Sequence, residues 1–154
     1  MKVINRCNNN SVSVKVIRVI ESDFSVINKT NFHFDWRKEQ FNKIYKLILI
    51  GSNEILGLMS IKEITKDQRV EIMLLDSSIL NSGKNKIYEG IAGNLIAFAC
   101  RESIRLFAEH VCVSLLPKTE LKKHYTQKYG MLDGGKHVYL DGISLFNLIK
   151  EYEI

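Results

Sequence analysis

An apolar strand followed by a long apolar helix is the feature that most limits how this chain can fold. Residues 70–75 (VEIMLL) are apolar apart from Glu71, which is typical of a central strand covered on both faces. After a polar loop, a helix is expected from about Tyr88 to Phe107, and its interior, residues 91–100, is too apolar for a surface helix. The segment therefore predicts a helix packed on a buried sheet.

The order of the remaining elements predicts the fold class. Strands dominate the first half, and strands alternate with helices in the second half. A short strand is expected before a turn at 8–10, and the further expected strands are 12–20, 44–50, 55–64, 70–75, 110–116 and 137–140. The expected helices are 88–107, 119–129, ended by Gly130, and 144–152, with Ser144 as N-cap. The sequence of residues 23–42 fits either short helices or a loop, and does not decide between them. The pattern predicts an α/β fold with a mixed sheet flanked by helices.

Length and composition predict a single domain over residues 1–154, which is enough chain to bury roughly 70% of its unfolded surface. The longest apolar runs, 47–50 and 95–100, are far below the roughly 20 residues of a membrane span. The first residues carry no signal-peptide core, so a cytoplasmic protein is expected. The three cysteines lack metal-ligand spacing. The net charge of +5 favours anionic partners, and nucleic acid or a phosphorylated cofactor would fit it.

Small residues open the apolar helix at Gly90, Ala92 and Gly93, after a loop that carries Lys84 and Lys86. A helix start exposes unpaired backbone N–H groups and the positive end of the helix dipole. Small side chains allow a pyrophosphate to approach those groups closely. The alternative is that the glycines only permit tight packing of the helix on the sheet.

Residues 44–140 resemble the acetyl-CoA-binding core of the GCN5-related N-acetyltransferase (GNAT) superfamily. That family has Gln/Arg-x-x-Gly-x-Gly/Ala at the start of a long helix, and a later helix with a tyrosine shortly before a glycine. The first pattern falls on 87–92 (IYEGIA) and the second on 110–131 (HVCVSLLPKTELKKHYTQKYGM). Ile87 stands where the family has Gln or Arg, so Lys86 or Lys84 would have to supply the side-chain contact to pyrophosphate.

The resemblance implies a GNAT-like splayed sheet and direct transfer of an acetyl group from acetyl-CoA to an amine, without a metal. Backbone groups near Leu74 and Leu75 would hold the pantetheine arm and polarise the thioester carbonyl. The cofactor contacts that it implies are Leu74, Leu75, Lys84, Lys86, Ile87, Tyr88, Glu89, Gly90, Ile91, Ala92, Gly93, Lys118 and Tyr125.

Glu71 and Tyr125 are the predicted catalytic residues. Glu71 is the one carboxylate within an apolar strand and matches the position of the catalytic glutamate in some family members; the alternative is an ion pair with a lysine at the sheet's rim. Tyr125 would protonate the leaving thiolate or position its sulfur, although Thr126 has the family's usual spacing of four residues before the glycine. Asp76 and His124 are the reserve candidates for the base.

The sequence does not identify the acceptor of the acetyl group, and an amine of a small molecule or of a protein would fit. One alternative function is a catalytically silent acyl-CoA-binding or regulatory domain, suggested by Ile87 and the tyrosine spacing. A basic nucleic-acid-associated domain is the other, and it is less favoured because no strand interleaves aromatic with basic residues. Dimers are frequent in this family, so a homodimer is open to this chain. A membrane is not an expected partner.

Overall fold

A nine-stranded mixed sheet forms the body of the computed structural model, which describes residues 1–152. The strands are β1 (Lys2–Asn5), β2 (Ser11–Arg18), β3 (Lys43–Leu49), β4 (Ile55–Ile64), β5 (Arg69–Ser77), β6 (Tyr88–Glu89), β7 (Cys112–Leu115), β8 (Leu132–Gly134) and β9 (His137–Asp141). Their order across the sheet is β6-β1-β2-β3-β4-β5-β7-β9-β8. Only β5 and β7 pair in parallel; the other described neighbours are antiparallel.

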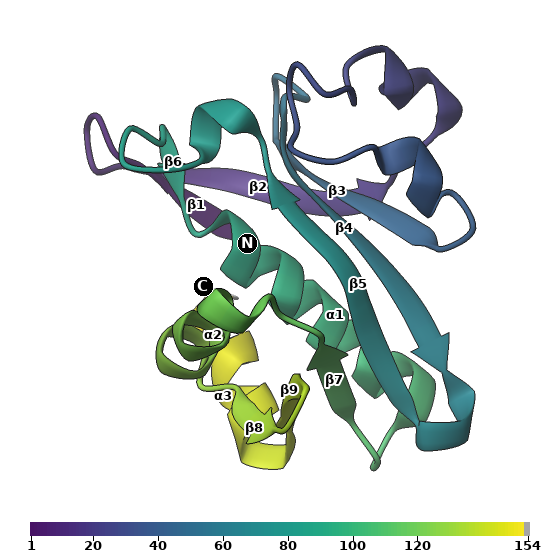
Figure 1. Cartoon of the computed structure of the whole chain (residues 1–154). Coiled ribbons are helices and arrows are strands. Elements are labelled where there is room, and N and C mark those ends of the chain that lie inside the picture. Colours follow the sequence, from purple (N-terminus) through teal and green to yellow (C-terminus); the bar gives the residue numbers. More distant parts are fainter. Residues whose placement is uncertain (153–154) are drawn as a thin grey trace.

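Within the part of the chain that the structure describes, three α-helices flank this sheet: α1 (Ile91–Phe107), α2 (Lys122–Tyr129) and α3 (Gly142–Tyr152). The long helix α1 lies across one face of the sheet, as Figure 1 shows, with α3 packed beside it. Leu95, Ile96 and Ala99 of α1 have no exposed surface. The burial predicted from the apolar interior of this helix is therefore confirmed, and so is the predicted α/β class.

The segment between β2 and β3, residues 19–42, covers the opposite face of the sheet. Two short 3-10 helices, Glu21–Ser25 and Trp36–Glu39, lie in it. Phe32 and Trp36 are buried there against Ile44 and Leu58, whereas neighbouring strand residues such as Met59 belong to the core under α1. Because successive strand residues face opposite sides, the two cores lie on the two faces of the sheet. The scattered aromatics of 23–42 thus form a second, smaller core.

The strands β5 and β7 part after a short paired stretch. Their register joins 70–72 to 113–115, and β5 then continues to Ser77 without a partner on that side. On its other side, β5 pairs with β4 through a register shift that leaves Met73 without an opposite residue. Figure 1 shows the two arrows diverging in front of α1. The parting leaves the backbone edge of 73–77 free of β7, as the expected splayed sheet requires.

Several boundaries differ from those expected. The long helix begins at Ile91 and not at Tyr88, because Tyr88 and Glu89 pair with β1 as the edge strand β6. The last helix begins at Gly142, before the expected N-cap Ser144, whose hydroxyl instead accepts from the Asp141 amide at 3.2 Å. The strand β8 was not expected. Within residues 1–152, the structure has no helix that is long and apolar enough to cross a membrane.

Candidate active site

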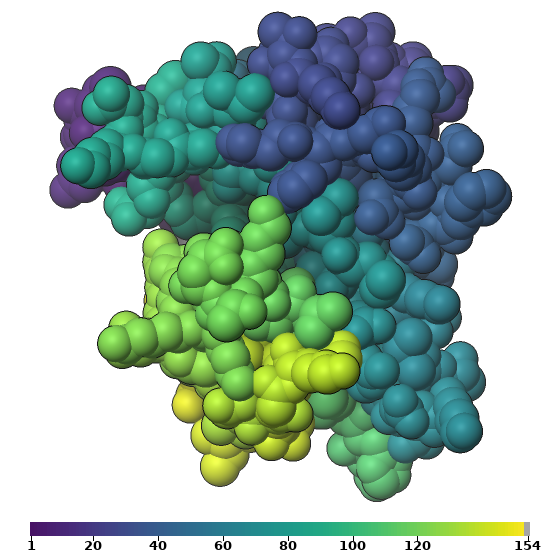
Figure 2. Space-filling view, viewed as in Figure 1, coloured from purple at the N-terminus to yellow at the C-terminus, as the bar shows by residue number. Residues whose placement is uncertain are grey.

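A hollow of about 570 Å³ lies where β5 and β7 part. Its walls come from the start of α1, the end of β5 with the loop that follows it, α2, and His33 and Phe34 of the segment 19–42. In Figure 2 the surface is recessed between the teal loop and the green α2. The predicted site residues that line this hollow are Leu75, Lys86, Tyr88, Gly90, Ile91, Ala92 and Tyr125.

The N-cap residue of α1, Gly90, sets the direction in which the helix starts beside the hollow. Gly90 has φ +97°, a left-handed conformation that turns the chain from β6 into the helix. The side-chain amide of Asn94 donates to Gly90 O at 2.7 Å and to Lys2 O at 2.8 Å, which ties the first turn to β1. The first N–H groups of α1, which have no partner within the helix, therefore have a fixed position next to the lining residues Gly90 and Ala92.

Gly93 serves a different purpose from Gly90. It is buried and does not line the hollow, and a Cβ built on it would overlap the ring of Tyr152 at the end of α3. The absence of a side chain at this position is needed for α3 to pack on α1. Of the two interpretations of the glycines, tight packing of the helix is the one that applies to Gly93.

Asn81 fixes the loop between β5 and β6, and the sequence offered no sign of this role. It is buried, its Oδ1 accepts from Tyr88 N at 3.0 Å, and its Nδ2 donates to Ser78 Oγ at 2.7 Å. These bonds position Lys86 and Tyr88 beside the hollow. A short polar residue in a loop with serines and a glycine is locally indistinguishable from an exposed turn residue.

Other predicted cofactor residues lie around the hollow without lining it. Lys84 and Ile87 offer their carbonyls to Arg6, at 3.1 and 2.9 Å, and Glu89 lines a neighbouring groove with Gly90. Leu74 packs against the smaller core.

Lys118 lies after β7, with its Nζ 5.8 Å from the ring centre of Phe34. This contact links the chain after β7 to the segment 19–42, and Phe34 is itself a lining residue.

On α2, Tyr125 lines the hollow and Thr126 does not. Burial raises the pKa of Tyr125, whose ring lies 6.0 Å from that of Tyr129 and 5.7 Å from that of His124, centre to centre. All three residues line the hollow. Thr126 does not line it, and its hydroxyl donates to Lys123 O at 3.0 Å. An uncharged phenol is therefore available to a bound molecule.

Glu71 lies in the part of β5 that still pairs with β7, opposite Ser114, and does not line the hollow. Its Oε1 is 2.8 Å from His137 Nε2 and 3.5 Å from Arg69 Nη1, and its side chain is 15% exposed. The partners of Glu71 are thus a histidine and an arginine, and not the lysine that the alternative named.

At the hollow, the structure brings together Asp76 and His33, which the sequence did not pair. Asp76 Oδ1 lies 2.6 Å from His33 Nδ1, and Asp76 Oδ2 accepts from His33 N and from Trp36 Nε1, both at 3.0 Å. The Asp76 side chain is 1% exposed and that of His33 43%. Both residues line the hollow. His33 and Asp76 are 43 positions apart, which explains why no local spacing pointed to His33.

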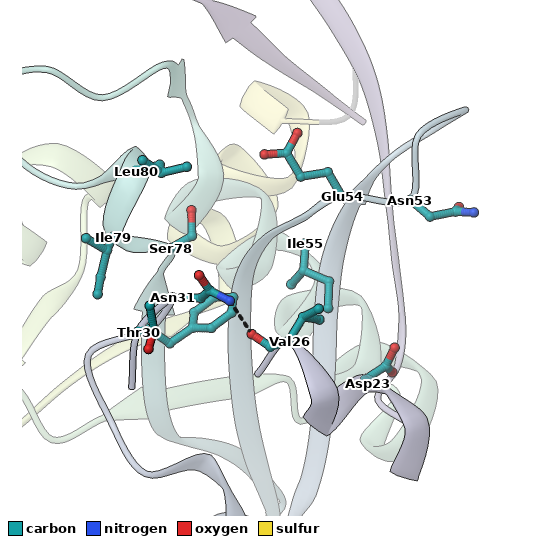
Figure 3. Close-up of a pocket in the computed structure, with 11 residues that line it drawn as sticks. Asp23, Val26, Thr30, Asn31, Asn53, Glu54, Ile55, Ser78, Ile79 and Leu80 are labelled. Carbon is teal, nitrogen blue, oxygen red and sulfur yellow. Dashed lines mark hydrogen bonds between the residues drawn. The ribbon is translucent and has the colours of Figure 1, made fainter. Parts of the chain in front are cut away.

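A second cavity, of about 440 Å³, lies beside the smaller core (Figure 3). Its apolar lining includes Val26, Phe32 and Ile55, and it contains two carboxylates, Asp23 and Glu54. Asp23 already pairs with Lys46 at 2.6 Å. None of the predicted site residues lines this cavity. Among residues 1–152, no group of three or more His, Cys, Asp or Glu side chains could hold a metal ion.

Comparison with solved structures supports the fold. The spermidine/spermine N-acetyltransferase SpeG from Vibrio cholerae matches with a TM-score of 0.58 and 14% identity, over 83% of this chain and 92% of that chain. The toxin AtaT, solved with its antitoxin's C-terminus and acetyl-CoA, matches with 0.56 and 14%, over 88% and 97%. Nourseothricin acetyltransferase matches with 0.54 and 10%, over 82% and 95%.

No protein-family model matches the chain, and no curated protein matches it in sequence. The likeness is therefore one of structure, and it covers most of each chain. The predicted GNAT fold is confirmed.

Proposed function

We propose that this chain is a single-domain N-acetyltransferase that binds acetyl-CoA in the hollow and transfers its acetyl group to an amine. One observation carries the proposal: the parting of β5 from β7 opens a hollow that is lined at once by the start of α1, the free edge of β5 and Tyr125. Acetyl transfer by SpeG and nourseothricin acetyltransferase, and acetyl-CoA in the AtaT structure, support it from the same fold.

The start of α1 is the proposed site for the pyrophosphate of acetyl-CoA. Its free N–H groups and the helix dipole favour an anion, and Gly90 and Ala92 leave room beside them. Lys86 and Lys128 also line the hollow and add positive charge. Among the described residues, the one ion pair of Lys86 is with Glu89, at 3.8 Å, so we assign to Lys86 the phosphate contact that Ile87 cannot make.

The free edge of β5 and the phenol of Tyr125 are the proposed groups for the thioester. A backbone N–H near Leu75 would polarise the carbonyl as negative charge develops on its oxygen. Tyr125 would give a proton to the sulfur that leaves. Because burial raises its pKa, the phenol carries that proton at neutral pH.

A charge placed at Ala92 tests the phosphate site without straining the backbone. Ala92 lies in the first turn of α1, where the helix dipole stabilises a carboxylate. We expect Ala92→Glu to stay folded and to lose the stabilisation by acetyl-CoA, because its carboxylate repels phosphate. Ala92→Gln, of the same size but uncharged, should keep most of it.

The measurement is a thermal melt with and without acetyl-CoA. At about a hundred times Kd, the ligand should raise the wild-type Tm by about 5–10 °C. No rise in the wild type would contradict the proposal, and salt-sensitive binding of RNA or DNA would then favour the nucleic-acid alternative. A rise without release of CoA in the presence of amines would favour the silent acyl-CoA-binding alternative.

A further inference from the structure

Among the described residues, the pair formed by His33 and Asp76 is the one contact between a carboxylate and an imidazole at the hollow. We propose that His33, oriented by Asp76, is the general base that removes a proton from the acceptor's ammonium group. This inference rests on the proposed function and adds to it the residue that activates the amine. It assigns to the segment 19–42 a direct part in the reaction.

The hydrogen bonds around Asp76 determine which nitrogen of His33 is available. Three donors converge on this carboxylate, namely His33 Nδ1, His33 N and Trp36 Nε1. A carboxylate that accepts from Nδ1–H fixes the tautomer in which Nε2 carries the lone pair. Within residues 1–152, Nε2 of His33 has no hydrogen-bond partner. The imidazole is thus held like a base that is oriented by an acid.

The position of the pair favours it over Glu71. Asp76 directly follows Leu75, whose backbone is the proposed contact of the thioester, and His33 lines the same hollow. Glu71 lies four residues earlier on the strand, which is about 13 Å of extended chain. Its carboxylate is also held by His137 and Arg69. A base has to reach the proton directly or through one water, and His33 is the residue placed to do so.

In the proposed step, the acceptor's ammonium group loses two protons. The acceptor R–NH₃⁺ gives one proton to Nε2 of His33, and the freed lone pair forms the C–N bond at the thioester carbon. As the C–S bond breaks, the sulfur takes the proton of Tyr125, and the second proton lost by the nitrogen restores the phenol through solvent. His33 releases its proton to solvent. The products are the acetylated amine, CoA–SH and one proton.

Several charged or titratable groups share the hollow with the imidazole. Asp76 lies behind it and stabilises the imidazolium that forms. The same hollow is lined by Lys86, Tyr88, His124, Tyr125, Lys128 and Tyr129, and Lys118 contacts the neighbouring Phe34. A pH profile of the wild type alone would combine these groups, so the assignment depends on the difference between variants.

His33→Asn is the decisive variant, because the asparagine amide keeps a donor near the position of Nδ1 and lacks the outward nitrogen. With spermidine, lysine methyl ester and a short peptide as probes, we expect kcat to fall by about 10²–10⁴-fold. The acidic limb of the pH–rate profile should vanish, added imidazole should restore part of the rate, and the Tm rise caused by acetyl-CoA should remain. His110→Asn, at an exposed histidine between α1 and β7, is the matched control.

Glu71→Gln separates the two candidate bases. We expect it to keep the acidic limb; loss of that limb in Glu71→Gln together with a kcat within about threefold of wild type in His33→Asn would overturn the inference. A wild type that neither binds acetyl-CoA nor releases CoA would instead refute the proposed function.

The tautomer of His33 can be tested without an acceptor, by ¹⁵N NMR of the histidine rings. We expect the neutral ring of His33 to carry its proton on Nδ1. A neutral ring with the proton on Nε2 would refute the role of the pair.

Discussion

Tyr125 and Thr126 are adjacent on α2, but their side chains meet different surroundings. Tyr125 lines the hollow, whereas the hydroxyl of Thr126 is bonded within the helix. We expect Tyr125→Phe to lower kcat by about 10–100-fold with an unchanged Tm rise on adding acetyl-CoA, because the ring stays and only the acidic proton is lost. Thr126→Val should behave like wild type. Steady-state release of CoA measures both, and a larger loss in Thr126→Val would give Thr126 the place facing the sulfur.

The pH dependence of this role has a defined sign. Burial raises the pKa of Tyr125 above the usual value of about 10 for a phenol. A proton donor works below its pKa, so ionisation of Tyr125 should cost no activity until the pH exceeds about 10. A loss that begins near pH 8 and disappears in Tyr125→Phe would contradict this expectation.

The sequence could point to Tyr125 and the glycines but not to the partner of Asp76. Gly90 and Tyr125 stand within short patterns whose spacing is local. His33 and Asp76 are 43 positions apart and meet only because the segment 19–42 folds back over the end of β5. Contacts of this range depend on tertiary packing, which no local periodicity contains.

Among the elements, the helices were easier to place than their ends. The apolar interior of α1 predicts its burial, but its start depends on whether Tyr88 and Glu89 pair with another strand. They pair with Asn5 and Ile4, more than eighty positions earlier. The segment 19–42 gave no periodic pattern because a few isolated aromatics, such as Trp36, form its core contacts.

The contact between α1 and α3 depends on Gly93, and a double-mutant cycle measures it. In a helix, alanine is favoured over glycine by about 0.5–1 kcal/mol. At Gly93, however, a methyl group would displace the Tyr152 ring. We expect Gly93→Ala to destabilise the wild type by about 1 kcal/mol and to stabilise the Tyr152→Ala variant, as urea unfolding would measure. Equal effects in both backgrounds would show that the two side chains do not interact.

At the scale of the whole molecule, the order of strands and helices predicts the fold class, but the parting of the sheet is a matter of register. The strands β1 to β6 form one part of the sheet, and β7, β9 and β8 form the other. Only three residue pairs, between 70–72 and 113–115, join the two parts in the parallel ladder. The length of this ladder depends on the bulge at Met73 and on the direction of β7. The hydrophobic pattern of the sequence predicts neither of them.

This division predicts how acetyl-CoA should affect the molecule. The hollow takes lining residues from both parts, for example Leu75 and Asp76 from β5 and Tyr125 and Lys128 from α2. A molecule bound between them links the two parts of the sheet, which the parallel ladder joins at three residue pairs. Hydrogen exchange should therefore slow in 74–78 and in 122–130 together when acetyl-CoA is added. The turn between β3 and β4 should exchange at an unchanged rate. Slowing confined to one of the two segments would mean that the ligand does not bind between β5 and α2.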